Sequence, residues 1–225
     1  MGCSSAKKWG TMYTKHTWDG GSHFHFQYVK YLPENYDETK KYPLVFFLHG
    51  AGERGDDLDV ACRHGFMKYV REEGKEYPFI FIAPQCPFEK YWGCYTESLF
   101  AFLDYICEEL PVDKDRIYLT GLSMGGTGTF MLAMAEPERF AAIAPVCGSG
   151  IIWYAEKLIG FPVYMFHGDC DKDVPIQESV NMLTKIHERG GNARLKICYG
   201  YGHNAWDVAY AGDELVEWLL SCKKA

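Results

Sequence analysis

The sequence predicts an α/β fold, in which a mainly parallel sheet of about eight strands carries helices on both faces. Continuous apolar runs, typical of strands buried on both faces, alternate along the chain with helix-like amphipathic stretches. Ahead of them, two segments that alternate polar and apolar residues predict an antiparallel hairpin. Because no repeat or Pro/Ser-rich linker interrupts the pattern, we expect a single domain over residues 11–225, after a flexible N-terminus at residues 1–10.

The elements are expected in a regular order. The hairpin joins residues 11–18 to residues 23–32 through the turn-forming sequence Asp19-Gly20-Gly21. The buried strands are expected at residues 43–49, 79–83, 116–120, 141–146, 161–166 and 193–198. The helices are expected at residues 58–72, 97–109, 124–136, 176–189 and 207–221. Since the chain between the strands at 141–146 and 161–166 is short, we expect a minimal lid.

Composition and charge exclude several classes of protein. Of the 225 residues, 48% are hydrophobic and 24% are charged, as in an ordinary globular protein. The net charge of −7 argues against nucleic acid as a partner, since phosphate binding needs clustered Lys and Arg. No apolar stretch approaches the roughly 20 residues of a membrane-spanning helix. The sequence as given indicates a cytoplasmic protein, or a secreted or lipid-anchored one if a leader has been removed, and it leaves the oligomeric state open.

The cysteines and paired histidines offer little support for a metal site. Nine cysteines show neither a CxxC pair nor zinc-finger spacing, and a reducing compartment fits them better than a disulfide framework. A bridge between Cys86 and Cys94 across their loop stays open. His23 and His25 share one face of a predicted strand, but no third ligand lies nearby in the sequence. We therefore expect a surface strand there, no metal and no cofactor.

The strongest chemical signal surrounds Ser123. The motif Gly121-x-Ser123-x-Gly125 follows a β-branched and aromatic strand and precedes a helix-forming run. In that strand–turn–helix context the serine occupies a strained turn, and its neighbours must be glycine to avoid clashes. The free N–H groups of the following helix then point at the reacting centre. The sequence predicts that Ser123 is a nucleophile.

A serine hydroxyl needs a base to remove its proton. His203 is flanked by Gly202 in a loop between the last predicted strand and the last predicted helix. Of the other histidines, His187 lies in a predicted helix, and His16, His23, His25, His49 and His64 all precede Ser123. We expect His203 to be the general base.

Three aspartates, which directly follow a buried strand, compete for the role of the acid that orients the base. Asp171 stands where a carboxylate usually meets the imidazole in such a loop. The alternatives are Asp169, which more often braces such a turn, and Asp173, which could be solvated or cap the next helix. Their Asp-x-Asp-x-Asp spacing does not make a calcium loop, because position six is Val174 rather than Gly.

A tetrahedral intermediate needs donors for its negatively charged oxygen. The strand at 43–49 ends in the turn His49-Gly50-Ala51-Gly52, which exposes backbone N–H groups. We assign the two donors to the N–H groups of Ala51 and Met124, and expect the His49 side chain to brace the turn. An ion pair between Glu53 and Arg54 is expected to hold the same turn.

Aromatic residues mark the expected substrate side. Tyr91 and Trp92 follow the carboxyl end of a strand, the edge at which ligands bind in open α/β sheets. They could hold a planar or sugar-bearing substrate, with Trp153 as a second wall. Simple packing of these rings is the alternative.

These motifs resemble those of a group of α/β-hydrolases, the small esterases of the phospholipase/carboxylesterase, predicted-peptidase and dienelactone-hydrolase-like type. The resemblance runs from Tyr31 to the C-terminus. It rests on His49-Gly-Ala-Gly-Glu-Arg-Gly55, Ala83-Pro-Gln-Cys-Pro87, Gly121-Leu-Ser-Met-Gly-Gly126, His167-Gly-Asp-Cys-Asp171 and Gly202-His-Asn-Ala-Trp206. It implies the α/β-hydrolase fold, and it places the triad and the oxyanion donors of the group on the residues chosen above, which favours Asp171 over its neighbours.

The resemblance implies a serine carboxylesterase that acts through an acyl-enzyme on a small-molecule or carbohydrate-linked ester. Relatives in the group include feruloyl esterases that act on plant polysaccharide. Dienelactone hydrolases proper use a cysteine nucleophile, so Ser123 argues against lactone hydrolysis. The alternatives are a serine peptidase of the prolyl-oligopeptidase-like type, an enzyme like the acyl-protein thioesterases, and a non-catalytic binding protein, which the intact set of motifs disfavours.

Overall fold

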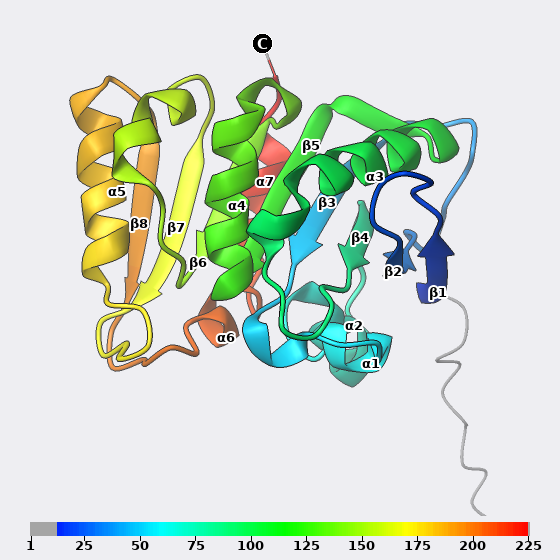
Figure 1. Ribbon diagram of the computed structural model, residues 1–225, viewed down its shortest axis with the longest axis horizontal. Helices are drawn as coiled ribbons and strands as arrows, with labels where there is room; N and C mark the ends of the chain where they lie inside the picture. Colours follow the sequence, from blue (N-terminus) through cyan, green and yellow to red (C-terminus); the bar gives the residue numbers. More distant parts are fainter. Residues whose placement is uncertain (1–12, 225) are drawn as a thin grey trace, which may run out of the picture.

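The computed structural model describes residues 13–224 of the chain. Within this range eight strands form one sheet in the order β1-β2-β4-β3-β5-β6-β7-β8 (Figure 1). The strands are β1 (Tyr13–Trp18), β2 (Phe26–Tyr31), β3 (Tyr42–Leu48), β4 (Ile80–Pro84), β5 (Val112–Leu122), β6 (Ala142–Val146), β7 (Val163–Gly168) and β8 (Ala193–Cys198). Strands β3 to β8 are parallel, while β2 is antiparallel to both β1 and β4. The expected flexible N-terminus at residues 1–10 lies outside the described residues.

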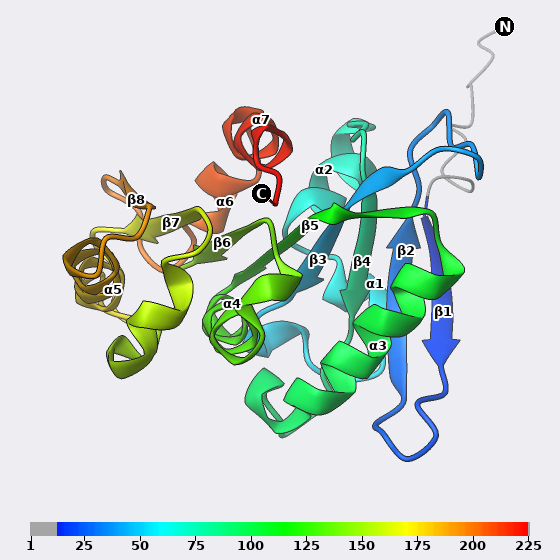
Figure 2. The ribbon, with the colours of Figure 1, turned by 90° about the horizontal axis from the view of Figure 1, so that it is seen from above.

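Helices cover both faces of the sheet, as Figure 2 shows from above. Helices α3, α4 and α5 lie on one face, and α2, α6 and α7 lie on the other. The helices are α1 (Leu58–Ala61), α2 (Phe66–Glu73), α3 (Thr96–Glu109), α4 (Met124–Ala135), α5 (Gln177–Glu188), α6 (Trp206–Ala209) and α7 (Glu214–Ser221). Within the described residues, no helix combines the length and the apolarity that crossing a bilayer requires.

The burial of strand β3 explains why its sequence is continuously apolar. Leu44, Phe46 and Leu48 pack in the core beneath α3 and α4, whereas Val45 and Phe47 pack in the core on the opposite face. Successive side chains of a strand point to opposite faces, so a strand covered on both sides needs apolar residues at every position.

The N-terminal hairpin forms, but its turn is longer than the sequence suggested. The second strand begins at Phe26, not at residue 23, because the preceding segment leaves the sheet and packs on α3. There the N–H of Phe24 donates to Ser98 Oγ at 3.1 Å. His23 and His25 therefore lie in a loop, and the expected surface strand does not extend to them. His25 Nδ1 lies 3.0 Å from Asp19 Oδ1.

Two predicted helices are broken. The predicted helix at 58–72 forms as α1 and α2, separated at Gly65, whose φ of 72° is left-handed. A Cβ atom at Gly65 would lie 2.6 Å from the ring of Phe47, so the chain passes too close to the sheet for a continuous helix. The predicted helix at 207–221 likewise forms as α6 and α7.

The segment between β6 and β7 is short and carries one 3-10 helix, η4 (Ile152–Leu158). This helix packs along α4 and α5 and is the only helix or strand of the segment, which the structure describes in full. The expectation of a minimal lid is confirmed. Since β3 to β8 are parallel, their carboxyl ends meet at one edge, the lower edge in Figure 1, and the loops that follow them build the site.

Candidate active site

Ser123 stands at the sharp turn between β5 and α4. Its φ of 54° and ψ of −118° put a non-glycine residue in a conformation that L-residues rarely adopt. A Cβ atom at Gly125 would lie 1.9 Å from the carbonyl oxygen of Leu48, and one at Gly121 would lie 2.5 Å from that of Gly125. Only glycine fits at these two positions, which explains the motif in steric terms.

Ser123, His203 and Asp171 form a continuous hydrogen-bonded chain. His203 Nε2 lies 2.7 Å from Ser123 Oγ, and His203 Nδ1 lies 2.7 Å from Asp171 Oδ2. Because the carboxylate can only accept, Nδ1 carries the proton and Nε2 is free to accept the serine proton. The residues come from three loops that follow β5, β7 and β8.

Asp171 is held as a carboxylate by its surroundings. Its side chain is fully buried, and its Oδ1 accepts the N–H groups of Asp173 and Val174, each at 2.9 Å. Burial by itself would raise the pKa of Asp171, but the hydrogen bonds from His203, Val174 and Asp173 together outweigh it and hold the pKa below its usual value. A charged acid beside a neutral histidine is the arrangement that a general base requires.

The two competing aspartates take other roles. Asp169 Oδ1 accepts the N–H of Gly200 at 2.7 Å, so Asp169 ties its own loop to the loop of His203. The side chain of Asp173 is exposed, and the first turn of α5 has no side-chain cap. Of the three, only Asp171 forms the hydrogen bond to His203.

A second imidazole contacts Asp171 and was not singled out from the sequence. His167 is fully buried, and its Nε2 lies 2.8 Å from the carbonyl oxygen of Val174 and 3.3 Å from Asp171 Oδ2. Its Nδ1 lies 2.7 Å from Ser179 Oγ. The sequence contains His167 as the first residue of the His167-Gly-Asp-Cys-Asp171 motif. Its contact with the Asp171 carboxylate, however, is evident only from the fold.

The two predicted oxyanion donors lie at helix starts. Thr127 donates the first hydrogen bond of α4, to Ser123, so the N–H of Met124 has no acceptor within its helix. Ala51 opens the 3-10 helix η1 (Ala51–Glu53), whose first hydrogen bond is donated by Glu53 to Gly50. Both N–H groups therefore remain available at the edge where Ser123 lies.

His49 and Trp92 brace the turn that carries Ala51. His49 Nε2 accepts the N–H of Cys86 at 2.9 Å, which leaves the proton on Nδ1, 2.7 Å from the carbonyl oxygen of Gly50. That carbonyl belongs to the same peptide group as the Ala51 N–H, so His49 fixes the orientation of the donor. Burial lowers the pKa of His49 to about 4, which keeps it neutral near pH 7.

Trp92, which was expected to contact substrate, is buried. It is 2% exposed, and its Nε1 donates to the carbonyl oxygen of His49 at 2.9 Å. The alternative, simple packing, is therefore the one that the structure supports. The indole stabilises the turn after β3 and does not reach the surface.

The expected ion pair between Glu53 and Arg54 does not form. Arg54 donates instead to the carbonyl oxygens of Ala51 at 2.8 Å and Lys90 at 3.1 Å. Glu53 is buried and points away, with its Oε1 3.8 Å from His64 Nε2. Arg54 thus joins the turn that carries Ala51 to the loop after β4, and it does so without an ion pair to Glu53.

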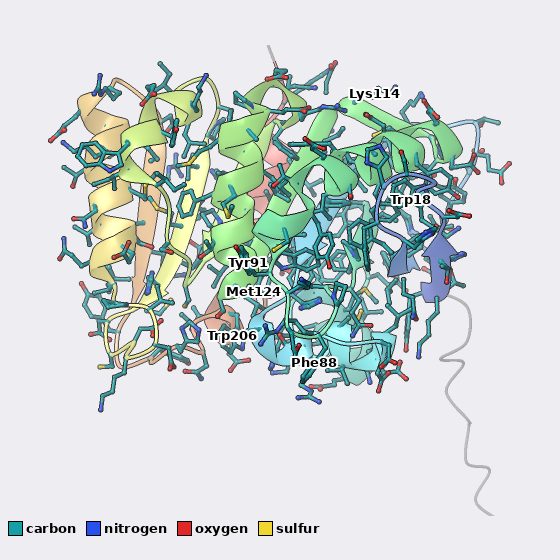
Figure 3. The ribbon with its side chains drawn as sticks, viewed as in Figure 1. Trp18, Phe88, Tyr91, Lys114, Met124 and Trp206 are labelled. Atoms are coloured by element: carbon teal, nitrogen blue, oxygen red, sulfur yellow. The ribbon has the colours of Figure 1, made fainter. Side chains whose placement is uncertain are left out.

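Four exposed aromatic residues lie on loops at the carboxyl edge. Phe88 and Tyr91 follow β4, and Figure 3 shows Tyr91 in the region of Met124. Tyr199 and Tyr201 follow β8 and precede His203, and no sequence pattern had singled them out. Trp153, which was expected to form a second wall, is 81% exposed on η4.

The cysteines described by the structure are all free. Cys86 is buried and Cys94 is exposed, so the possible bridge between them is not formed. Two groups of potential metal ligands occur within residues 13–224, and both contain Asp171, whose oxygens already accept protein hydrogen bonds. One of them includes Cys147, where burial raises the thiol pKa to about 12.

Known proteins share this sequence and this fold. The model of the Esterase family matches residues 25–221. The protein named "Probable feruloyl esterase C" from Aspergillus terreus is 29% identical over 170 residues, which cover 73% of this chain and 62% of that protein. Dipeptidyl-peptidase 5 from Aspergillus fumigatus is 26% identical over 212 residues, covering 72% of this chain and 29% of that protein.

Among solved structures, a thermostable esterase superposes with a TM-score of 0.85 and 30% identity, covering 94% of this chain and 63% of that one. The eight-stranded sheet with its N-terminal hairpin and flanking helices matches this structure, so the predicted α/β-hydrolase fold is confirmed. The chain spans slightly less than two thirds of the lengths of the feruloyl esterase C relative and of this thermostable esterase.

Proposed function

Because the chain belongs to the Esterase family, we propose that it is a serine carboxylesterase that works through an acyl-enzyme on Ser123. One observation carries the proposal. Ser123 Oγ, held in a strained turn, lies 2.7 Å from the unprotonated nitrogen of a histidine that a buried carboxylate orients. This arrangement activates a hydroxyl that would otherwise be a weak nucleophile.

The proposed reaction has two halves. His203 Nε2 takes the proton of Ser123 as Oγ forms a bond to the ester carbonyl carbon. The carbonyl oxygen becomes negative and is held by the N–H groups of Ala51 and Met124, each worth roughly 3 kcal/mol of barrier. As the carbon–oxygen bond to the alcohol breaks, His203 delivers its proton to the leaving oxygen. A water then attacks the acyl-enzyme by the same route, which frees the acid and restores Ser123.

A feruloyl ester or a related carbohydrate-linked ester is the substrate that we propose. The relatives named feruloyl esterase C support this choice. The exposed rings of Phe88 and Tyr91 also support it. They lie on the loop that Arg54 joins to the turn carrying Ala51, and they offer flat apolar surface to a planar acyl group. The short η4 segment leaves the site open to a bulky alcohol.

Replacement of Ser123 by Ala tests the proposal. Hydrolysis of a p-nitrophenyl ester and covalent labelling by a fluorophosphonate should both disappear, while the thermal unfolding midpoint stays at or above that of the wild type. Retained hydrolysis would show that Ser123 is not the nucleophile. A panel of acetyl, butyryl, long-chain and feruloyl esters then gives the acyl preference.

The second candidate is a serine peptidase, which the similarity to dipeptidyl-peptidase 5 favours. The same triad could attack an amide, whose nitrogen leaving group His203 would protonate. Hydrolysis of aminoacyl p-nitroanilides with no hydrolysis of simple esters would select the peptidase. The reverse result would select the esterase.

A further inference from the structure

Two pairs of exposed aromatic residues flank the nucleophile along the carboxyl edge of the sheet. Phe88 and Tyr91 follow β4, and Tyr199 and Tyr201 follow β8. Among the parallel strands of the described sheet, β4 and β8 are the two outermost, and β5, which Ser123 follows, lies between them. An ester also extends in two directions from its carbonyl carbon, into the acyl group and into the alcohol.

The chemistry of the triad distinguishes the two directions. His203 must give its proton to the leaving alcohol oxygen, so that oxygen lies next to His203 Nε2. The carbonyl oxygen points to the N–H groups of Ala51 and Met124. The alcohol therefore leaves on the side of the loop that follows β8, and Tyr201 stands two residues before His203 on that loop.

The loop that carries these tyrosines is fixed by its neighbour. Asp169 Oδ1 accepts the N–H of Gly200 at 2.7 Å, and the N–H of Cys170 donates to the carbonyl oxygen of Tyr201 at 3.0 Å. A Cβ atom at Gly168 would lie 2.3 Å from that same carbonyl oxygen, so the two loops are in direct contact. A fixed backbone lowers the entropy that is lost when a ligand binds.

The two rings are exposed and make no aromatic or side-chain hydrogen-bond contact in the described part of the chain. Tyr199 is 77% exposed and Tyr201 is 39% exposed. Between residues 13 and 224, neither ring stacks on another aromatic ring and neither hydroxyl has a protein hydrogen-bond partner. Large side chains left exposed beside a reactive centre commonly mark a binding surface.

We propose that Tyr199 and Tyr201 form the alcohol-side subsite and take a sugar ring of a carbohydrate-linked ester, an inference that rests on the proposed function. A tyrosine presents a flat apolar face and a hydroxyl at little entropic cost. A sugar ring presents an apolar C–H face and a rim of hydroxyls, which matches both features. An alkyl alcohol would use only the apolar face and would gain less from two separate, exposed rings.

The test compares two substrates with the same acyl group, a methyl ester and an ester on an arabinose-substituted xylo-oligosaccharide. The acyl group is acetyl or feruloyl, whichever the wild type hydrolyses as the methyl ester. In the variant Y199A/Y201A we expect kcat/KM for the sugar ester to fall about tenfold, with the methyl ester within about twofold of wild type. Ile159→Ala, which truncates an exposed side chain before β7, is the control and should change neither.

Equal losses on both substrates would mean that the double variant disturbs His203, and would overturn the subsite. Unchanged hydrolysis of both would overturn it as well. Y199F/Y201F keeps the rings and should retain most of the preference for the sugar ester. Failure of the proposed function would give different results. Either the Ser123→Ala variant would still hydrolyse esters, or the wild type would hydrolyse neither the acetyl nor the feruloyl methyl ester.

Discussion

Asp171 lies between two imidazoles, because its Oδ2 is 2.7 Å from His203 Nδ1 and 3.3 Å from His167 Nε2. His167 Nε2 also lies 2.8 Å from the carbonyl oxygen of Val174, so its N–H lies between that carbonyl and Asp171 Oδ2, the oxygen that His203 contacts. Cys147 Sγ and a carboxylate oxygen of Asp173 also lie within 4.8 Å of this acid. Asp171 Oδ2 is therefore contacted by two imidazoles, while its Oδ1 accepts the N–H groups of Asp173 and Val174.

Loss of the His167 imidazole should disturb the position of Asp171. His167→Leu removes the ring that lies 3.3 Å from Asp171 Oδ2 and 2.8 Å from the carbonyl oxygen of Val174, whose own N–H donates to Asp171 Oδ1. We expect kcat for p-nitrophenyl acetate to fall by about tenfold, because the acid no longer holds the His203 imidazole in a fixed orientation. His167→Gln, which can place an N–H near the same position, should recover most of the rate, and Ser179→Ala, which removes only the partner of Nδ1, should change it by less than about threefold. A His167→Leu variant with the wild-type kcat would contradict this role.

Asp171 and Asp173 should differ by orders of magnitude when each is replaced by Asn. Asp171→Asn removes the acceptor that fixes the His203 tautomer, and we expect kcat to fall by about 10⁴-fold. Asp173→Asn leaves the backbone N–H that donates to Asp171 in place, so its rate should stay within about threefold of wild type. Steady-state hydrolysis of p-nitrophenyl acetate measures both. Similar losses in the two variants would show that the acid is misassigned.

The buried His49 should make the protein less stable in mild acid. Its folded-state pKa of about 4 lies below the ordinary 6.5, so below pH 6.5 the unfolded chain binds a proton that the folded chain does not. The free energy of unfolding should therefore decrease as the pH falls from about 6.5 to about 4, by about 3 kcal/mol from this residue. Urea unfolding at several pH values measures the slope. His49→Gln, although less stable overall, should show a smaller slope over this range; an unchanged slope would exclude His49 as the source.

The turn at Ser123 should store strain that glycine releases. A non-glycine residue at φ 54° and ψ −118° costs roughly 1–3 kcal/mol, so Ser123→Gly should be more stable than Ser123→Ala by about this amount. Thermal unfolding of the two inactive variants gives the comparison. Equal stabilities would mean that the turn is unstrained.

The glycines around Ser123 should not tolerate a methyl group. Gly125→Ala would bring a Cβ atom against the carbonyl oxygen of Leu48 and should prevent the native turn, with loss of both soluble yield and activity. Gly160→Ala is the matched control, because a Cβ atom at that position would meet no other atom within 4 Å. A folded, active Gly125→Ala variant would contradict the geometry of the turn.

Most of the fold was predictable because it depends on local patterns. Strands buried on both faces leave an apolar run, and the motif around Ser123 reflects a steric requirement within a few residues. The break at Gly65 was not predictable, since its cause is the ring of Phe47 on a distant strand. The same reason explains why residues 23–25 were assigned to a strand, although Phe24 leaves the sheet to contact Ser98.

The same distinction between local and long-range causes applies to the residues of the site. Ser123 and His203 could be named from motif, order and loop, and Asp171 could be chosen from three neighbours with the help of the family resemblance. The structure brings the three side chains within hydrogen-bonding distance. The burial of Trp92 and the partners of Arg54 depend on how the loop after β4 meets the turn after β3, and no local pattern records that contact. His167 went unnoticed because a histidine inside a buried strand looks, in sequence, like one that packs in the core.

The short segment between β6 and β7 lies along α4 and α5, and this has a consequence for how substrate arrives. Some esterases have a lid that covers the site until an oil–water surface opens it. An uncovered site needs no such opening, so the rate of hydrolysis should show no sudden increase when the substrate concentration passes the solubility limit. A polymer can also approach such a site sideways. Esters in the middle of a chain should then be cleaved as readily as esters at its ends.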